Sequence, residues 1–496
     1  MTSPLRTARR GALAHWPWLV PVMVGTFIYL TRGSFLERAV SGLLAFTVVL
    51  IASRRPDRSL LILIVGLPFQ GFVLAQLYAW GLPAALVRPL SAWKETLALG
   101  VVVAGVRGFR TSGRRLDRLD LLGLAYVGII GAYALLPELF APGAPTGTNV
   151  RSLGFRATAG FVILLLAARH ARLPHDFATR AARVVMIVGS VVAAVAVYEY
   201  FFSDSWNSFV VDRVQYIRYQ VDILDVRPFH FTDIRRYGHI GGREVVRVGS
   251  VFVDHIPFAF YLLLPFAVAV ERTLRAGLRS GAGAALLLTA TALLLTQTRS
   301  ALIGALAIAF LAASPGAGRR TNRRVQFGLI FAAGLILALP AASATGLSER
   351  AATAASGEEE SAIDHVESFW KGVHAISAEP LGDGLGTSAG VGQRFAPGQT
   401  TVSENNYLQV GIETGVISMA VFLVLTVAMI RHLHRAARAV ADLGSSAARS
   451  AGIGLAIGAL FLQMWNHFAV AWTFWAIAGA AIGIANRRRL EAVAEA

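Results

Sequence analysis

Hydrophobic residues recur along this chain in blocks of about 14 to 24 residues, and short arginine-rich segments separate the blocks. A helix needs about 20 apolar residues to cross the hydrocarbon core of a bilayer, so the blocks predict transmembrane helices. We expect fourteen crossings. Twelve is the alternative, because the second and tenth blocks are short and the last two nearly adjoin. The blocks lie near residues 14–30, 39–52, 60–79, 88–106, 119–137, 156–170, 184–202, 256–270, 282–297, 300–313, 327–345, 407–430, 451–468 and 470–486.

Two long connections interrupt this pattern, and the parity of the crossings places both on the extracytoplasmic side. The sequence thus predicts an all-α fold, a polytopic membrane bundle of about 12–14 transmembrane helices with two extended extracytoplasmic loops. The expected parts are N-terminal helices at 1–202, the first loop at 203–255, central helices at 256–345, the second loop at 346–406 and C-terminal helices at 407–496.

The composition agrees with this prediction and explains the charge. Hydrophobic residues make up 55% of the 496 residues and charged residues 15%. The net charge of +17 comes from arginines clustered between apolar blocks, where they set membrane orientation and do not indicate nucleic-acid binding. Their distribution predicts that both termini face the cytoplasm. The chain contains no cysteine, which excludes disulfides and thiolate metal sites.

Arg299 lies between two apolar stretches, where a charge is costly: about 2.5 to 3.5 kcal/mol for an arginine at the centre of a membrane helix. The stretch from Ala282 to Ala313 would be about 48 Å long as one helix, against a hydrocarbon core of about 30 Å. Arginines flank both of its ends, which the positive-inside rule places in the cytoplasm. The segment should therefore form a hairpin, with Arg299 near an outer turn at Thr296 to Ser300.

The second loop has a pattern too regular for a passive linker. Val366, Phe369, Trp370 and Val373 recur at the spacing of one helix face, which predicts a short amphipathic lid helix on the bilayer or over a cavity. An interfacial helix that only packs is the alternative. The glycine-rich segment 380–388 then predicts a tight turn. A nucleotide site is disfavoured there, because no strand precedes the glycines.

Polar residues lead directly into the next crossing. Glu404 lies at its mouth, and Gln409 and Glu413 lie a turn apart inside it. Acids inside a membrane are candidates for function. The alternatives are that Glu404 caps the helix and that Glu413 forms an internal ion pair.

Further candidates lie in the two loops. Arg247 could join Arg299 as a second cation or be a solvated loop residue, and Arg394 is a comparable candidate. His255, where the first loop re-enters the membrane, could react, cap a helix or pack. Phosphate-binding and zinc motifs are absent from the sequence, as is a dense carboxylate cluster, so we expect neither metal nor cofactor.

Three stretches resemble the O-antigen ligase and Wzy-type polymerase superfamily. Residues 295–304 (Leu-Thr-Gln-Thr-Arg-Ser-Ala-Leu-Ile-Gly) are similar to its Thr-x-Ser-Arg pattern. Phe369-Trp370-Lys371 followed by residues 380–386 (Pro-Leu-Gly-Asp-Gly-Leu-Gly) resembles its loop helix with a glycine-rich turn. Residues 405–409 (Asn-Asn-Tyr-Leu-Gln) with 413–415 (Glu-Thr-Gly) resemble its His-Asn-x-Tyr-Leu and Glu-x-Gly, and Arg247-Val248-Gly249-Ser250 also fits.

The resemblance implies a metal-independent glycosyltransferase that moves a glycan from a polyprenyl diphosphate lipid to an acceptor hydroxyl at the outer face of the bacterial cytoplasmic membrane. The implied partners are the lipid-linked glycan, a glycan or lipid acceptor and membrane lipid. The implied site places the diphosphate on Arg299, Arg247 and Arg394. Glu404 stands where ligases present a histidine and would be the catalytic base beside Arg299, a departure that favours a polymerase or a ligase for another acceptor. The expected substrate-binding or lid residues are Trp370, Asn405, Tyr407, Glu413 and His255.

Two other functions compete with glycan transfer. A flippase or transporter for lipid-linked glycans is also polytopic, but its charged groups should lie near the midplane, accessible from either side in turn. A noncatalytic assembly partner would leave Arg299 as a member of a structural ion pair.

Overall fold

The computed structural model describes residues 35–113, 115–141, 146–226, 232–240, 243–278, 280–313, 360–388 and 403–495. Its first half contains these helices: α3 (Phe35–Arg54), α4 (Pro56–Gly66), α5 (Gln70–Ala79), α6 (Ala84–Leu90), α7 (Trp93–Ser112), α8 (Arg118–Leu135), α9 (Pro137–Phe140), α10 (Thr148–His170), α11 (Phe177–Phe201), α12 (Ser203–Ser208), the π-helix η2 (Phe209–Arg213) and α13 (Tyr216–Asp222). An antiparallel hairpin of β1 (Arg236–Ile240) and β2 (Arg243–Arg247) follows.

The rest of the described chain is helical. It contains the 3-10 helix η3 (Ser250–Phe252), α14 (His255–Ala276), α15 (Gly281–Thr296), α16 (Arg299–Ala313), α19 (Glu360–Ala378), α21 (Asn406–Val440), α22 (Leu443–Gly458), the 3-10 helix η4 (Met464–Asn466) and α23 (Phe468–Glu495).

The predicted fold class is confirmed. Among the described residues, six helices are long and apolar enough to span a membrane, namely α8, α10, α11, α14, α21 and α23. The pair α4 and α5, bent by 72°, can form a seventh span, and shorter apolar helices lie at Ala45–Arg54, Gly281–Thr296 and Arg299–Ala312. The expected crossings near 14–30 and 327–345 lie outside the described residues, so the total of 12–14 stays a prediction.

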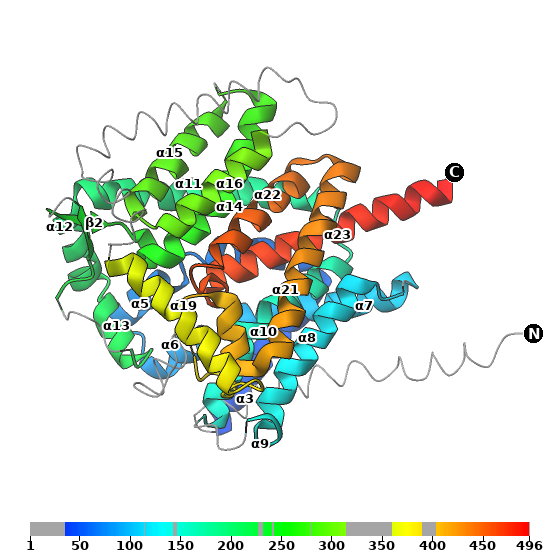
Figure 1. The fold of residues 1–496 in the computed structure, drawn as a ribbon, viewed down its shortest axis with the longest axis horizontal. Coiled ribbons are helices and arrows are strands. Elements are labelled where there is room, and N and C mark those ends of the chain that lie inside the picture. The colour runs from blue at the N-terminus through cyan, green and yellow to red at the C-terminus, as the bar shows by residue number, and fades with distance from the viewer. Residues whose placement is uncertain are drawn as a thin grey trace, which may run out of the picture.

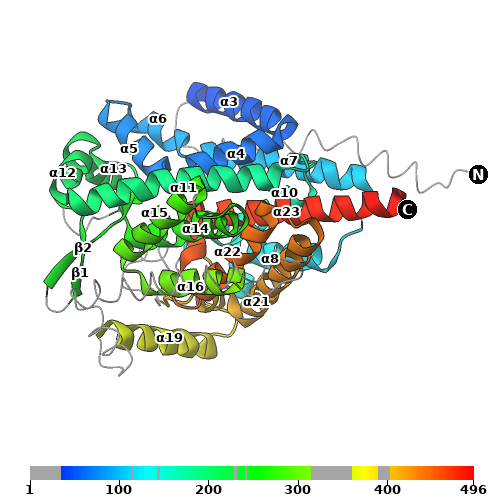
Figure 2. The ribbon, with the colours of Figure 1, turned by 90° about the horizontal axis from the view of Figure 1, so that it is seen from above.

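The bundle has two chemically different ends. Figure 2 shows β1 and β2 on the left with α19 close to that side, and the C-terminus at the other end, on the right; Figure 1 shows β2 on the left and α19 to the lower left, away from the C-terminus. We call the end with β1, β2 and α19 the loop end. The other end is the arginine-rich end, where arginine side chains bind backbone oxygens of neighbouring helix ends: Arg275 binds Ala441 O, and Arg487 binds Ala171 O, each at 3.0 Å.

Two helices form the centre of the bundle. In the most apolar stretch of each helix, 94% of the residues of α23 and 89% of those of α14 are buried, whereas only 33% of those of α8 are buried. Small residues allow neighbouring helices to approach them closely: a Cβ at Gly479 of α23 would lie 2.2 Å from Leu165 O of α10. Close backbone approach at small residues is a common way for membrane helices to pack.

The predicted hairpin around Arg299 is confirmed. α15 ends at Thr296, α16 begins at Arg299, and Gln297 between them has a left-handed backbone (φ 52°). Both arms pack on α14. In addition, α15 packs on α11 and α16 packs on α22. Gly304 and Gly454 bring α16 and α22 together, because a Cβ on either would lie within 2.8 Å of the other's carbonyl oxygen.

α21 is broken, which corrects the expected crossing at 407–430. As one helix its 35 residues would measure about 52 Å, more than the hydrocarbon core requires. Thr414 and Gly415 are non-helical (Gly415 φ 82°, ψ 168°) and divide α21 into an arm at 406–413 and a longer part at 416–440. Gln409 and Glu413 therefore lie on the arm, ahead of the long helical part.

The glycine-rich segment 380–388 is inserted into this break. Asp383 N donates to Ile412 O at 2.7 Å, Gly384 N donates to Glu413 O at 3.1 Å, and Val416 N donates to Pro380 O at 2.9 Å. These bonds satisfy backbone groups that an unbroken helix would pair internally. Gly382 and Gly415 are in contact, since a Cβ on Gly382 would lie 2.6 Å from Gly415 N. The turn predicted from the glycines thus exists, and it is the partner of the helix break.

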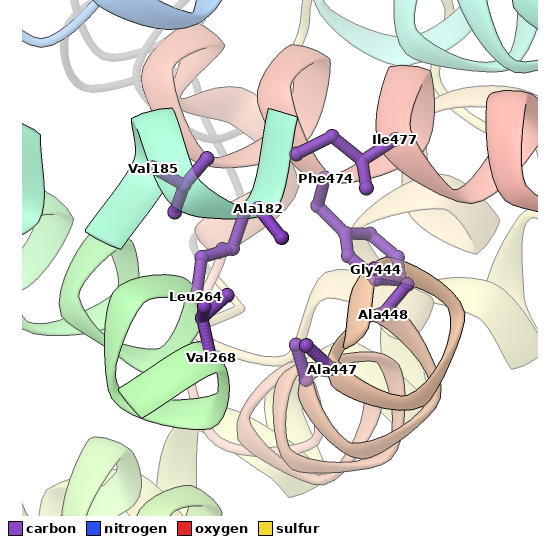
Figure 3. Close-up of a pocket in the computed structure, with 10 residues that line it drawn as sticks. Ala182, Val185, Leu264, Val268, Gly444, Ala447, Ala448, Phe474 and Ile477 are labelled. Carbon is purple, nitrogen blue, oxygen red and sulfur yellow. The ribbon is translucent and has the colours of Figure 1, made fainter. Parts of the chain in front are cut away.

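A small apolar void lies between α11, α14, α22 and α23 (Figure 3). Its lining includes Ala182, Leu264, Ala447 and Phe474, and its volume is about 20 Å³. A void of this size holds about one water, and apolar walls offer that water no hydrogen bonds. A larger hollow of about 450 Å³ lies at the arginine-rich end beside Arg172 and Arg487. Neither is lined by residues of the loop end.

Replacing Gly454 with alanine should weaken the packing of α16 on α22. The added methyl would lie 2.7 Å from Gly304 O, and overpacking of this kind costs about 1 to 3 kcal/mol. We expect a lower unfolding temperature in detergent. Gly128→Ala is the matched control, because no atom lies within 4 Å of the added methyl. Equal unfolding temperatures for Gly454→Ala and Gly128→Ala would show that this contact does not limit stability.

Replacing Gly415 with alanine should release the glycine-rich segment from the break. The new Cβ would lie 2.7 Å from Pro380 O, and the positive φ adds a strain of about 1 to 3 kcal/mol. Gly81→Ala carries a similar positive φ (92°) in open space and isolates the strain. Thermal unfolding should show a larger loss for Gly415→Ala than for Gly81→Ala. A loss no larger than that of the control would refute the docking role.

Candidate functional site

Arg299 occupies the first turn of α16, at the loop end of the bundle. Thr298 O accepts from Ala301 N and Leu302 N, both at 3.1 Å, so Thr298 begins the helix and Arg299 follows it. The Arg299 side chain is exposed. The first amides of a helix carry partial positive charge and attract anions, and a guanidinium beside them strengthens that field. The turn at 297–299 is therefore suited to an anionic ligand.

Arg247 lies against the same turn. Its Nη2 donates to Gln297 O at 2.9 Å, and Val248 N donates to Leu295 O at 3.4 Å. β1 packs on the turn as well, since a Cβ on Gly238 would lie 2.7 Å from Gln297 Oε1. The side chain of Arg247 is partly buried. The structure thus brings Arg247 together with the turn that carries Arg299, and its role there stays a prediction.

A buried carboxylate holds the segment that presents Arg247. Glu199 of α11 accepts from Gly249 N at 3.1 Å and from Ser250 N at 2.6 Å, and Ser250 Oγ donates to Val192 O at 2.7 Å. Gly249 is required for close packing, because a Cβ there would lie 2.7 Å from Asp254 N. These contacts fix the path of the chain between β2 and α14.

His255 opens α14 next to this segment. Asp254 caps the helix, its Oδ1 accepting from Ile256 N at 3.0 Å, and it lies 3.7 Å from His255 Nδ1. The His255 side chain is mostly buried, at 11% exposure. The helix cap is therefore Asp254, and His255 is packed beside it.

α19 forms the amphipathic helix predicted for the second loop (Figure 1), and we call it the lid helix, although its role as a lid stays a prediction. Three residues of the apolar face that predicted it point away from the protein: Val366, Phe369 and Trp370 are 59%, 42% and 54% exposed. The fourth, Val373, is partly buried and packs on the arm. The face that packs contains Gly372 and Ile376. A Cβ on Gly372 would lie 2.9 Å from Ser403 Oγ, and Ile376 packs with Leu408 and Ile412 of the 406–413 arm.

Glu404 is tied to this lid helix. Its carboxylate contacts His365 Nδ1, and its backbone N donates to Ser368 Oγ at 3.0 Å. It does not cap α21. That role belongs to Asn405, whose Oδ1 accepts from Tyr407 N at 2.8 Å and from Leu408 N at 3.0 Å. The capping alternative for Glu404 is therefore wrong, and its carboxylate is available to the lid.

The polar side chains of the arm form a buried network with the link between α22 and α23. Asn406 Oδ1 accepts from Trp465 N at 2.8 Å, and Asn466 Nδ2 donates to Gln409 Oε1 at 2.8 Å. Glu413 Oε1 accepts from Ser388 N at 3.3 Å. In the described part of the chain the partners of Glu413 are thus amides, and the structure gives no support to the alternative of an internal ion pair. Tyr407 is also buried, and its hydroxyl donates to Ala456 O at 3.1 Å.

Helix packing places Arg299 and the arm at the same height. α16 and α22 run antiparallel and touch at Gly304 and Gly454. Arg299 lies five residues before Gly304, about 7.5 Å along α16, and Ala459 lies five residues after Gly454 along α22. Because the two helices run in opposite directions, Arg299 and Ala459 lie at the same level. Asn406 N donates to Ala459 O at 2.9 Å. The Arg299 turn and the arm beside Glu404 therefore flank the same end of α22.

Asp383 is a further ionisable group near the site. Burial raises the pKa of the half-buried Asp383 carboxyl in the glycine-rich segment, and the nearby Glu379 charge raises it further. Among the described residues, no three histidines, cysteines or carboxylates group closely enough to hold a metal ion. Arg394 lies outside the described residues.

Sequence reasoning missed His365 and Ser368. Both precede Gly372 and Ile376 at helical spacing, so the packing face of α19 runs through 365, 368, 372 and 376. This stripe was readable beside the apolar stripe at 366, 369, 370 and 373, but a polar and glycine-containing face is seldom the face that packs. The partner of His365 is Glu404, which lies outside α19, so their contact depends on tertiary structure and not on local pattern.

Comparison with known proteins supports the family resemblance. A search of curated proteins finds no match to this chain. The family model described as O-antigen ligase matches residues 284–423, which include the Arg299 turn, α19, the glycine-rich segment and the arm with Glu404. This match supports a membrane glycan-processing function of the ligase or polymerase type. The chain is a polytopic helical membrane protein whose residues 284–423 match the family model described as O-antigen ligase.

Proposed function

We propose that this protein transfers a glycan from a polyprenyl diphosphate lipid to an acceptor hydroxyl at the outer face of the bacterial cytoplasmic membrane. It would act as a polymerase or ligase in the synthesis of O-antigen or another envelope polysaccharide. The observation that carries the proposal is the placement of Arg247 and Arg299 at one turn of the loop end. The O-antigen ligase match covers Arg299.

The orientation follows from the distribution of charge. The arginine-rich end, with Arg172, Arg275 and Arg487, would face the cytoplasm by the positive-inside rule. The loop end would then lie at the outer surface, where lipid-linked glycans are joined to acceptors in this family. α23 ends at the arginine-rich end, so this orientation places the C-terminus in the cytoplasm. The N-terminus is expected there too.

The donor's leaving group defines what the site must supply. When the acceptor oxygen bonds to the anomeric carbon, the bond from that carbon to the diphosphate breaks, and the diphosphate leaves with the electron pair. Arginine forks can bind phosphate oxygens in pairs and stabilise this charge without a metal. Arg299, with the first amides of α16, and Arg247 would bind the diphosphate, and Arg394 is a further candidate ligand.

The other predicted residues would organise the acceptor side. Glu404 lies beside the lid and belongs to the machinery that takes the acceptor proton. The exposed apolar stripe of α19, including Trp370, would rest on the membrane surface beside the lipid donor. Asn405, Tyr407 and Glu413 would hold the arm in place, because their side chains are buried and hydrogen-bonded. His255 would support the segment that presents Arg247.

The position of these groups disfavours a transporter. Alternating access requires a site near the midplane that opens to both sides. Here Arg247, Arg299 and Glu404 all lie at the loop end of the described bundle. This arrangement fits chemistry at one membrane surface.

Replacing Arg299 with lysine keeps the charge but removes the planar fork. We expect transfer to fall about 10²- to 10³-fold, as when one donor that stabilises transition-state charge is lost. The assay is transfer from a lipid-linked glycan in membrane vesicles with matched protein levels. Arg218→Lys is the control, since Arg218 is exposed on α13 and pairs with Asp222 at 3.3 Å. Full activity of Arg299→Lys would remove Arg299 from the diphosphate site.

The glycan left in a deletion strain distinguishes the two forms of the proposed reaction. Single units stranded on the lipid carrier would indicate a polymerase. Full-length chains on the carrier would indicate a ligase.

A further inference from the structure

The lid helix places an imidazole against the carboxylate at the site. His365 Nδ1 contacts Glu404 Oε2, and both side chains are partly open to solvent, at 43% and 40% exposure. An exposed ion pair contributes little to stability by itself, so this pair is not what holds α19 in place. The position of α19 must come from the packing of the helix on the arm.

That packing fixes the register of α19 on the arm. Ser368 Oγ accepts from Glu404 N at 3.0 Å, one helical turn from His365. Gly372 allows contact with Ser403 and Leu408, and Ile376, only 9% exposed, packs on Leu408 and Ile412. The glycine-rich segment that follows α19 is hydrogen-bonded into the break of α21. α19 is thus anchored along one face and at its C-terminal end, and His365 is held at Glu404.

The contact selects one nitrogen of the ring. A carboxylate at Nδ1 accepts the proton there and leaves Nε2 as a proton acceptor. Imidazole is the side chain whose proton affinity best suits acid–base work near neutral pH, whereas a carboxylate needs burial to reach that range. The oxygen of Glu404 that contacts His365, Oε2, is buried, so the carboxylate is placed to act as the partner of an imidazole.

We propose that His365 is the general base and that Glu404 positions it. This inference rests on the proposed function. The acceptor O–H would give its proton to His365 Nε2 as its oxygen bonds to the anomeric carbon and the bond from that carbon to the diphosphate breaks. Glu404 would stabilise the imidazolium formed in this step. The base would thus be carried by the lid helix and would be in place only while α19 is docked.

Substitution of each partner tests the dyad. His365→Gln should lower the transfer rate about 10²- to 10⁴-fold, the usual contribution of a general base, while leaving donor affinity unchanged. His374→Gln is the matched control, because His374 lies on the same helix and its Nδ1 contacts Trp370 O at 2.9 Å. The double variant with Glu404→Gln should be little slower than His365→Gln alone, since the two residues act as a unit.

Two further readouts separate a chemical role from a structural one. The loss of rate on acidification, expected when an imidazole base becomes protonated, should be absent in His365→Gln. The reciprocal exchange, His365→Glu with Glu404→His, should recover part of the activity lost in His365→Gln, because it keeps an imidazole beside a carboxylate.

The possible failures are distinguishable. A His365→Gln variant as active as His374→Gln would overturn the dyad and leave the proposed transfer intact. The same holds if only Glu404→Gln is inactive, because Glu404 would then be the base. A wild-type protein that binds the lipid-linked glycan without transferring it would overturn the proposed function and the dyad together.

Discussion

The break in α21 is the constraint on which the rest of the loop end depends. A helix interrupted inside a bundle leaves backbone groups that need partners, and an unpaired buried group costs about 1 to 3 kcal/mol. The segment 380–388 supplies these partners at Ile412, Glu413 and Val416. In doing so it ties α19 to the arm at 406–413. The lid, the arm and the glycine-rich segment therefore form one unit, although more than twenty residues separate α19 from α21 in the sequence.

The second constraint is electrostatic. Cations are unfavourable at helix N-termini, and arginines are costly inside the hydrocarbon core, yet Arg299 begins α16 between two apolar helices and Arg247 binds the preceding turn. Glu199 accepts three hydrogen bonds from the segment that presents Arg247, counting both contacts to Gly249 N. A protein that places two arginines at one turn in this way concentrates positive potential there. Such a field stabilises an anion such as a diphosphate, and it explains why the site can be built from residues that weaken the fold locally.

Much of this could be predicted from the sequence because it depends on local pattern. Apolar block length predicted the helical membrane fold, and residue count with arginine flanks predicted the hairpin at Arg299. The spacing of Val366, Phe369 and Trp370 predicted the lid helix, although that face turned out to be exposed. The break in α21 was missed, since Glu413-Thr414-Gly415 lies in an apolar run that reads as one helix. The contact of His365 with Glu404 was missed as well, because it depends on how two distant segments pack.

The proposed transfer requires that the loop end break the bond between a glycan and its lipid diphosphate. The most direct measurement is the release of polyprenyl diphosphate by the purified protein in liposomes supplied with a lipid-linked glycan and an acceptor. We expect each new glycosidic bond to be accompanied by one released polyprenyl diphosphate. Movement of the intact lipid-linked glycan across the bilayer, with no polyprenyl diphosphate released, would contradict it.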